Sequence, residues 1–343
     1  MAGSGTAHLR DEDDVVLSVR NLTVEYVGKG GERVFAVSDV SFDARRGETV
    51  GLVGESGCGK SSVAKAIMQL PAPTSGSVMM DGVEVAGLTG PALRRQRHKL
   101  QMIFQDPTSS LNPLRTVEDI IAEGLRIHGG GSKADIESRA RAMIERVGLD
   151  PDTAADRRPH EFSGGQCQRI SIARAMVLDP EVVICDEPVS ALDVSIQAQI
   201  MNLLEEMKAR YQLTLLFIAH DLAVVKNISD RIVVMYLGKV CEVASSDDLF
   251  ASPIHPYTRA LVQSIPEPDP DALIQETALS GDLPSPMNPP SGCRFRTRCP
   301  LAQDICASEE PQIREVRPGR FAACHFPLTD SKQPERAAET ALV

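Results

Sequence analysis

The sequence is short of positive charge. It has 36 Lys and Arg residues against 47 Asp and Glu, which gives a formal net charge of −11. Because binding to a nucleic-acid backbone needs clustered cations, this balance argues against a general nucleic-acid surface. Any basic patch must be local, and we expect no nucleic-acid partner.

Long apolar runs are also missing. No stretch approaches the ~18 consecutive apolar residues that a membrane span needs, and one of the longer runs, 213–219, is typical of a buried strand. The first residues lack an apolar segment and carry four acidic residues, 11–14, so we expect 1–14 to be a disordered acidic tail and not a secretion signal. We therefore expect a cytosolic protein, in which the eight cysteines are thiols or metal ligands rather than disulfides.

What the sequence does contain is a glycine-rich loop, Gly54-Glu-Ser-Gly-Cys-Gly-Lys60-Ser61. A short apolar run, 49–53, leads into it and a segment of helical composition, 61–70, follows, which is the strand–loop–helix context of a phosphate-binding loop. In such a loop, backbone N–H groups and a helix N-terminus face the phosphates. We expect Lys60 to bridge the β- and γ-phosphates of a nucleotide and Ser61 to place its hydroxyl on Mg²⁺. A glycine turn with an incidental lysine is the alternative.

The nucleotide-binding residues predicted in this segment are Gly54, Glu55, Ser56, Gly57, Cys58, Gly59, Lys60, Ser61 and Ser62. Two interpretations of Cys58 are open. The helix N-terminus and Lys60 would lower the pKa of its thiol and make it reactive towards thiol reagents. Alternatively, cysteine is a small residue that fits the loop.

A second apolar run, 182–185, ends in Asp186-Glu187. We expect Asp186 to hold Mg²⁺ through water and Glu187 to polarise the attacking water as general base. An acidic pair that merely caps a helix is the alternative. Between the two motifs, apolar residues at helical spacing in 118–128 and 134–147 predict a helical insertion, and alternation within 15–45 predicts antiparallel strands.

The segment Phe162-Ser163-Gly164-Gly165-Gln166 decides among the classes of nucleotide-binding protein. With it, essentially the whole chain resembles the ATP-binding cassette (ABC) family, in which two nucleotide domains close head to tail over two ATP molecules. The resemblance implies that this signature, Ser163 to Gln166, contacts ATP bound to the partner's phosphate loop. Phe162 replaces the usual leucine, a change of apolar shape that we expect to be harmless. The alternative is that Ser-Gly-Gly only caps a helix.

The resemblance assigns roles to further residues. Gln105 matches the glutamine that reaches Mg²⁺, His220 the histidine that contacts the γ-phosphate, and Tyr26 the aromatic that stacks on adenine, with packing as its alternative. Ser190 and Asp193 match the loop that passes between the two protomers. The expected catalytic residues are thus Lys60, Glu187 and His220, and the expected Mg²⁺ ligands are Ser61, Gln105 and Asp186.

Within the family, the sequence is most similar to the ATPase subunits of oligopeptide and dipeptide permeases, through 103–113, 159–169, 190–197 and 255–259. The resemblance implies a peripheral ATPase on the cytoplasmic face of the cell membrane that energises peptide uptake. Its implied partners are a second ATPase chain, usually non-identical but with a homodimer as the alternative, two transmembrane permease subunits and an external solute-binding protein. Related importers carry nickel or glutathione.

Two other classes of function are less favoured. Soluble ABC ATPases that act on DNA or ribosomes usually have coiled-coil arms or two cassettes, whereas this chain has one phosphate loop, one signature and no sustained heptad pattern. A regulatory module without catalysis is disfavoured because Lys60, Asp186, Glu187 and His220 are all present.

The expected fold is an α/β P-loop NTPase of the ABC type with an antiparallel β subdomain, a helical insertion and a small cysteine-containing C-terminal extension. The expected domain limits are a tail at 1–14, the ATPase domain at 15–255 with its helical subdomain at about 106–179, a proline-rich extension at 256–330 and a flexible tail at 331–343. We expect the extension to cover the ATPase domain without forming a second large core.

Four cysteines in this extension predict a metal site: Cys293, Cys299, Cys306 and Cys324. Soft thiolates favour Zn²⁺ or an iron–sulfur cluster, and the absence of C-x₂-C pairs argues for the cluster. Some of the peptide-permease ATPases that the chain resembles carry a [4Fe-4S] centre here. Unligated thiols in a small lobe are the remaining alternative. Three interleaved arginines, 294, 296 and 298, are expected either to offset the charge of a thiolate cluster or to form a solvated basic face.

Overall fold

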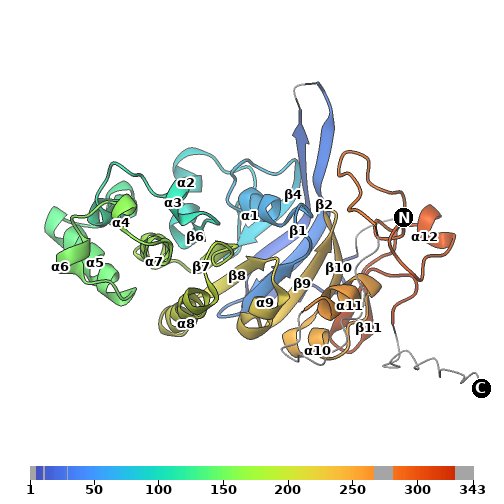
Figure 1. The fold of residues 1–343 in the computed structure, drawn as a ribbon. Coiled ribbons are helices and arrows are strands. Elements are labelled where there is room, and N and C mark those ends of the chain that lie inside the picture. Colours follow the sequence, from blue (N-terminus) through green and yellow to red (C-terminus); the bar gives the residue numbers. More distant parts are fainter. Residues whose placement is uncertain (1–4, 11, 29, 266–280, 329–343) are drawn as a thin grey trace, which may run out of the picture.

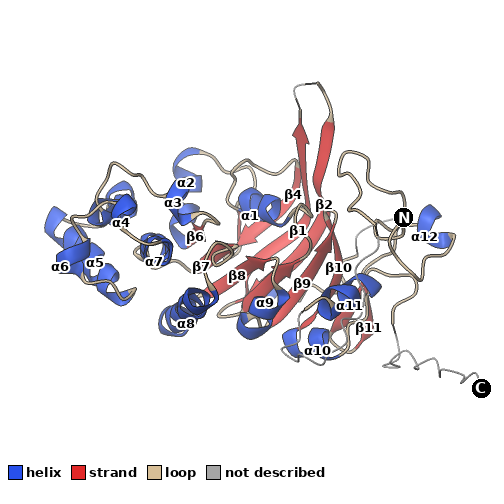
Figure 2. Cartoon of the chain, in the orientation of Figure 1, coloured by secondary structure: helices blue, strands red, loops and turns tan. Residues whose placement is uncertain are grey.

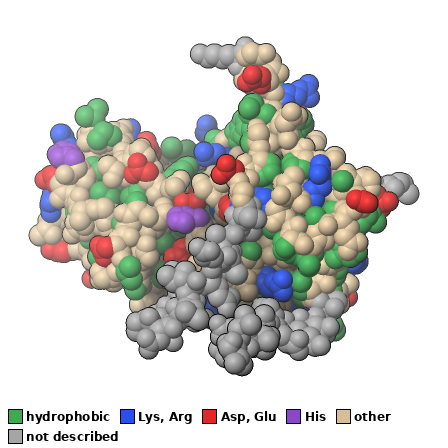
Figure 3. All heavy atoms as spheres, turned by 45° about the vertical axis from the view of Figure 1, so that its right-hand side comes forward, with side chains coloured by type: hydrophobic (Ala, Val, Ile, Leu, Met, Phe, Trp, Pro, Cys, Tyr) green, Lys and Arg blue, Asp and Glu red, His purple; other side chains and the backbone are tan. Residues whose placement is uncertain are grey.

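The computed structural model of the chain describes residues 5–10, 12–28, 30–265 and 281–328. Two β-sheets lie at the centre, with a group of helices at one end and the C-terminal extension at the other (Figures 1 and 2). On the face drawn in Figure 3, basic and acidic side chains of the described residues are interspersed over the surface. No helix within the described ranges is long and apolar enough to span a membrane.

The larger sheet has eight strands in the order β11-β12-β10-β9-β3-β8-β7-β6. The five strands from β9 to β6 run parallel, and β10, β11 and β12 are antiparallel additions at one edge. Its central strands are buried on both faces, which is why they appear in the sequence as continuous apolar runs. The strands are β3 (Thr49–Val53), β6 (Leu100–Ile103), β7 (Val182–Asp186), β8 (Thr214–Ala219), β9 (Arg231–Tyr236), β10 (Lys239–Ser245), β11 (Arg314–Arg317) and β12 (Arg320–Ala322).

The smaller sheet is antiparallel, with the order β2-β1-β4-β5. Its strands are β1 (Val15–Val27), β2 (Arg33–Arg45), β4 (Ser75–Met80) and β5 (Val83–Glu84). Apolar residues of β1 and β2 share one core with helix α1 (Lys60–Ile67) and one face of the larger sheet. The expected α/β fold with an antiparallel subdomain is confirmed.

Helices α4 to α7 form the subdomain at one end of the molecule (Figure 1). The Thr116 side chain caps α4 by accepting the Asp119 N–H, and Gly129 ends it in the left-handed conformation. Ser132 and Asp135 form a capping box at the start of α5. The helices from this part of the chain are α2 (Gly90–Lys99), α3 (Pro107–Ser110), α4 (Val117–His128), α5 (Lys133–Arg146), α6 (Pro151–Ala154) and α7 (Gly164–Met176), with a 3₁₀ turn η2 (Pro159–Glu161).

The remaining helices are α8 (Val194–Tyr211), α9 (Leu222–Ile228), α10 (Ser246–Ala251), α11 (Pro256–Gln263) and α12 (Ile305–Ser308), with a 3₁₀ turn η1 (Glu12–Asp14) before β1.

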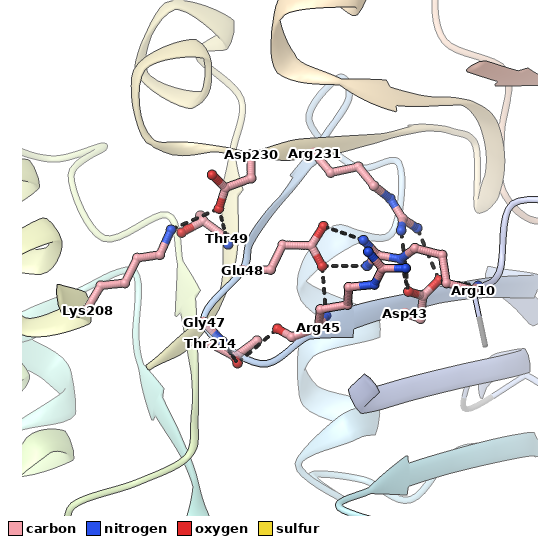
Figure 4. Close-up of polar contacts among 10 residues, drawn as sticks. All are labelled: Arg10, Asp43, Arg45, Gly47, Glu48, Thr49, Lys208, Thr214, Asp230 and Arg231. Atoms are coloured by element: carbon pink, nitrogen blue, oxygen red, sulfur yellow. Dashed lines mark hydrogen bonds and ion pairs between the residues drawn. The ribbon is translucent and has the colours of Figure 1, made fainter. Parts of the chain in front are cut away.

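Residues 5–10 pack against the antiparallel sheet, although the sequence predicts that 1–14 is a disordered tail. His8 is buried and its Nε2 lies 2.7 Å from the Ser41 carbonyl oxygen. Arg10 donates to the buried Asp43 carboxylate at 2.6 Å and pairs with Glu48, and Arg231 of β9 reaches the same Asp43 at 3.2 Å (Figure 4). Burial raises the pKa of Asp43, but Arg231 and Arg10 outweigh burial and lower it. The ion pairs therefore hold this segment against the sheet, and composition gives no sign of them.

A second polar network joins the start of β3 to the neighbouring elements (Figure 4). The Thr49 N–H donates to the Asp230 carboxylate at 2.7 Å, and Lys208 of α8 pairs with the same carboxylate at 2.9 Å. The Gly47 N–H donates to the Thr214 hydroxyl at 2.9 Å. The amino end of the central strand is thereby fixed to β8, α8 and the turn before β9.

The C-terminal extension does more than cover the ATPase domain, because it adds two strands to the larger sheet. Ala322 and Phe321 of β12 pair with Glu242 and Val243 of β10. Glu242 is fully buried and accepts the N–H groups of Ile254 at 3.0 Å and of His255 at 2.7 Å. The extension is therefore continuous with the main sheet.

We predict that His255, the N-terminal cap of α11, makes stability depend on pH. Its Nδ1 accepts the Tyr257 N–H at 3.1 Å, and burial lowers its pKa from 6.5 to about 4. The unfolded chain therefore binds this proton at a higher pH than the folded chain, so stability is lost as the pH falls from 6.5 towards 4. The loss is roughly 3 kcal/mol over that window.

The measurement is urea unfolding of the wild type and His255→Asn between pH 7 and pH 4. Asparagine can still cap the helix but does not titrate, so its pH dependence should be shallower. Burial raises the pKa of neighbouring Glu242, which acts with the opposite sign but is present in both proteins. Parallel pH profiles for the two proteins would contradict the assignment.

Candidate active site

The predicted site residues follow three neighbouring parallel strands. The glycine loop comes directly after β3, Asp186 and Glu187 lie at the end of β7, and His220 follows β8. These strands are adjacent in the order β3-β8-β7 and run in the same direction. Their carboxyl ends therefore meet at one edge of the sheet, where open α/β folds bind ligands.

Two positions in the loop can be occupied only by glycine. Gly54 and Gly59 have φ values of 152° and 105°. A Cβ atom on Gly54 would lie 2.2 Å from the Met235 carbonyl oxygen, and one on Gly59 would lie 2.1 Å from the Ala36 carbonyl oxygen. The loop thus fits between β2 and β9 only without side chains at these two positions.

Lys60 is buried and its ammonium donates to the carbonyl oxygens of Gly54 at 2.7 Å and Glu55 at 3.1 Å. The Ser61 hydroxyl donates to the Asp186 carboxylate at 2.8 Å. Burial raises the pKa of Asp186, and the Ser61 hydrogen bond partly opposes this. A cation here would favour the charged carboxylate, and a hydroxyl beside a carboxylate is the oxygen donor set that Mg²⁺ prefers.

Glu187 is the centre of a second group. Its carboxylate accepts the Gln105 amide N–H at 3.0 Å and lies 3.2 Å from His220 Nδ1. Glu187 has a φ of 48°, an unfavourable backbone conformation for this residue type that is typical of functional sites. The structure therefore brings together three side chains from three separate segments of the chain.

A cavity of about 590 Å³ lies over these groups. Tyr26 lines it from β1, with its hydroxyl 3.4 Å from the Ser62 hydroxyl. The extension contributes Pro286, whose carbonyl oxygen accepts the Phe35 N–H at 3.0 Å, and no sequence motif points to this residue. The predicted site residues that line the cavity are Tyr26, Ser56, Gly57, Gly59, Lys60, Ser61, Ser62, Gln105, Glu187 and His220.

Gly54, Glu55 and Cys58 do not line this cavity, although they belong to the same loop. The Glu55 side chain is directed to Arg298 of the extension at 2.7 Å. The Cys58 side chain is buried in the core, and burial raises the pKa of its thiol, outweighing the opposite effect of Lys60. Cys58 therefore has the environment of a packing residue and not of a reactive thiol.

The signature residues lie outside the cavity. The Ser163 hydroxyl accepts the Gln166 N–H at 3.3 Å and the Gln166 amide oxygen accepts the Ser163 N–H at 3.0 Å, which makes a capping box on α7. Ser163 and Gly164 are exposed, while Gly165 packs against Ile196 of α8. The α7 N-terminus thus presents N–H groups to the surface, as an anion site requires.

The loop predicted to lie between protomers caps α8. The Asp193 carboxylate accepts the Ile196 N–H at 3.0 Å, and the Ser190 hydroxyl donates to the Glu187 carbonyl oxygen at 3.1 Å. Val194, next to Asp193, is 82% exposed. This loop links an exposed apolar surface directly to Glu187.

All four cysteines of the extension line one small pocket, together with His255 and His325. Burial and the neighbouring cysteines raise the pKa of Cys293 to about 11 and that of Cys324 to about 12. Among the residues that the structure describes, no three His, Cys, Asp or Glu side chains have the geometry to hold a metal ion.

The three arginines of this segment are directed to other groups. Arg294 donates to the Leu237 carbonyl oxygen and the Ser38 hydroxyl, Arg296 to the Ser291 carbonyl oxygen, and Arg298 to Glu55. Arg294 and Arg298 are therefore inward-facing, and the expectation of a solvated basic face does not hold for them.

Two protein families match this chain. The ABC transporter family matches residues 37–190, which hold the phosphate loop, the signature and Glu187. The family "Oligopeptide/dipeptide transporter, C-terminal region" matches residues 241–306. A putative peptide import ATP-binding protein of Brucella ovis is 56% identical over 309 residues, covering 90% of this chain and 97% of its own. The chain belongs to the ABC transporter family of ATP-binding proteins.

Other members of the ABC family agree with this assignment. The oligopeptide transport ATP-binding protein OppF of Escherichia coli is 52% identical over 310 residues, covering 87% of this chain and 92% of its own. Among solved structures, the ATP-binding cassette MJ0796, a dimer in a post-hydrolysis state bound to ADP and Pi, is 30% identical with a TM-score of 0.61. It covers 67% of this chain and 98% of its own.

We predict that Cys58 reacts slowly with thiol reagents whether or not ATP is present, because its side chain is buried and its thiol is protonated. Mass spectrometry after brief labelling of the native protein should find Cys58 unmodified in both conditions. Rapid labelling of Cys58 without nucleotide, blocked by ATP, would restore the reactive-thiol interpretation. As a control, the protein unfolded in urea should be labelled at Cys58, which shows that the reagent is active.

Proposed function

We propose that this chain is the ATP-hydrolysing subunit of an ABC importer that energises uptake of oligopeptides or dipeptides. The observation that carries the proposal is the convergence of Lys60, Ser61 and the Glu187 group around one cavity, with Asp186 behind its lining and hydrogen-bonded to Ser61. The peptide class of the solute is supported by the C-terminal family match and by the names of the relatives.

Each group has a role in this proposal. Lys60 exchanges the loop carbonyls for the β- and γ-phosphates, and Tyr26 packs against adenine. Ser61, Asp186 and Gln105 are the residues that would hold Mg²⁺, which neutralises phosphate charge when bound. Glu187 accepts a proton from the attacking water, and His220 contacts the γ-phosphate from its place beside Glu187.

The signature supports a dimer as the active form. Ser163, Gly164, Gly165 and Gln166 lie outside the cavity of their own chain, so we assign them to ATP on a partner's phosphate loop. The loop with Ser190 and Asp193 then lies between protomers, and MJ0796 is a dimeric relative. A second, non-identical ATPase chain is the partner we favour, with a homodimer as the alternative.

The segment after Gln105 is the proposed contact with two transmembrane permease subunits. Leu114 in this segment is 78% exposed, and Gln105 at its start is hydrogen-bonded to Glu187. A change at the site can therefore reach an exposed apolar surface through one short segment. The chain would act peripherally at the cytoplasmic face of the cell membrane, with an external binding protein that delivers the solute.

Glu187→Gln tests the proposal in the complex reconstituted with its membrane subunits and peptide-loaded binding protein. We expect unchanged ATP binding and a turnover lower by about 10² or more, because the general base is lost. Glu205→Gln, an exposed change on α8, is the matched control and should hydrolyse ATP normally. Near-normal turnover of Glu187→Gln would contradict the role of Glu187 as general base. Stimulation of ATP hydrolysis by nickel or glutathione instead of peptide would show that the importer carries that solute.

A metal centre at the four cysteines is a separate part of the proposal. Their soft donor set and their shared pocket support a [4Fe-4S] cluster, with Zn²⁺ as the alternative, although the thiols would have to turn towards the metal to ligate it. A bound cation would favour the thiolates that burial now disfavours. The ligands would be Cys293, Cys299, Cys306 and Cys324, and the role would be structural.

Elemental analysis and absorption spectra of anaerobically purified protein test this centre. We expect about four irons per chain and a brown colour, both lost in Cys299→Ser but kept in the control Cys167→Ser. Zinc in place of iron would show that the four cysteines form a zinc site and not an iron–sulfur cluster. Protein that contains neither iron nor zinc would contradict the proposed metal centre.

A further inference from the structure

The phosphate loop carries an acidic side chain that is bound by the C-terminal extension. Arg298 Nη1 lies 2.7 Å from Glu55 Oε2, and Arg298 Nη2 lies 3.1 Å from Glu55 Oε1. This is the bidentate geometry of a strong arginine–carboxylate pair. The Arg298 side chain is 5% exposed and the Glu55 side chain 28% exposed, so water screens the pair only in part.

The extension also holds the backbone of the same residue. The Glu55 N–H donates to the Tyr257 hydroxyl at 2.9 Å. Tyr257 is fully buried in α11, where it packs edge-on against Tyr236 with ring centroids 4.8 Å apart and in a tilted contact against Phe295 with centroids 5.3 Å apart. Glu55 is therefore fixed through both its side chain and its main chain by residues that follow the ATPase domain.

The position of Arg298 depends on the same aromatic cluster. Its N–H donates to the Phe295 carbonyl oxygen at 3.0 Å, and its guanidinium lies 5.9 Å from the centre of the Tyr236 ring. Arg298 directly precedes Cys299, one of the four cysteines around the small pocket. The fold of the segment that carries these cysteines, residues 293–324 (the cysteine lobe), thus determines where this guanidinium lies.

The charge of Glu55 would oppose nucleotide binding if it were left alone. The triphosphate of ATP is strongly negative, and an unpaired carboxylate in the loop that surrounds it would repel the phosphates. The bidentate contact places the Arg298 guanidinium, which stays charged at any physiological pH, directly on the Glu55 carboxylate and neutralises it. Because Glu55 does not line the cavity, its carboxylate acts through its field and not through contact.

We propose that Arg298 is a positioning residue for ATP binding, which neutralises Glu55 and makes full ATP affinity depend on the C-terminal extension. This inference rests on the proposed function, because it takes ATP as the ligand of the loop. It assigns to the extension a part in the nucleotide site beyond covering the sheet edge.

The test measures the Kd of Mg-ATP for the purified full-length chain by calorimetry, with Arg298→Gln, Glu55→Gln and the double variant. Arg298→Gln should weaken binding about tenfold, because it leaves Glu55 charged and unpaired. The double variant should recover affinity to within about threefold of the wild type, since neither charge remains. Glu55→Gln alone should bind at least as tightly as the wild type.

Controls separate this charge effect from a loss of structure. Arg296→Gln changes a neighbouring arginine that contacts Ser291 and should leave the Kd unchanged. Arg298→Lys should bind ATP better than Arg298→Gln. In the reconstituted complex, Arg298→Gln should raise the KM for ATP with little change in kcat. If Arg298→Gln fails to fold, the two variants that contain Glu55→Gln still carry the test.

Three results would overturn the inference. An unchanged Kd in Arg298→Gln would remove the role of Arg298, and a double variant as weak as Arg298→Gln would make that role purely structural. A loss of affinity in Glu55→Gln alone would mean that the carboxylate itself assists binding. If the wild type binds no Mg-ATP, the proposed function fails as well, whereas wild-type binding with an unchanged Arg298→Gln defeats only this inference.

Discussion

The structure depends on the parallel alignment of β3, β8 and β7 at the centre of the larger sheet. Every residue of these strands is buried, so their backbone groups must pair within the sheet and their register is fixed from both sides. That alignment places the phosphate loop, Glu187 and His220 at one edge, although they are far apart in sequence. The chemistry therefore needs only short polar segments after each strand.

The charged and polar groups of the site are hydrogen-bonded to one another and to the loop backbone. Lys60 is bound to loop carbonyls, Ser61 to Asp186, and Glu187 to Gln105 and His220. ATP with Mg²⁺ would exchange these partners without requiring the strands to move. A buried lysine and two adjacent carboxylates are costly to bury unpaired, so these internal contacts stabilise the positions of the groups.

The sequence was sufficient for the parts of the fold that follow from local physics. Local patterns predict the secondary structure of three parts of the chain and their order along it. These parts are the apolar runs of β3, β7 and β8, the helices of the insertion and the glycine loop. The docking of residues 5–10 was not predictable, because it depends on Asp43 and Arg231, which are distant in the sequence. The sequence gives no sign of strands β11 and β12 for a similar reason, since β12 pairs with β10, and β11 with β12, only after a long proline-rich stretch.

In the phosphate loop too, side-chain positions depend on residues distant in the sequence and are not predictable from the motif. The spacing of the loop residues predicts a phosphate loop whose members bind the nucleotide, yet the Cys58 side chain is buried in the core and the Glu55 side chain is directed to Arg298. A motif specifies the backbone path, whereas the direction of each side chain depends on what packs behind the loop. Here the extension packs behind it, so a segment outside the ATPase motifs determines the charge next to the phosphates. The cysteine lobe and the nucleotide site are thus joined by two consecutive residues, Arg298 and Cys299, and the fold offers a direct route from one to the other.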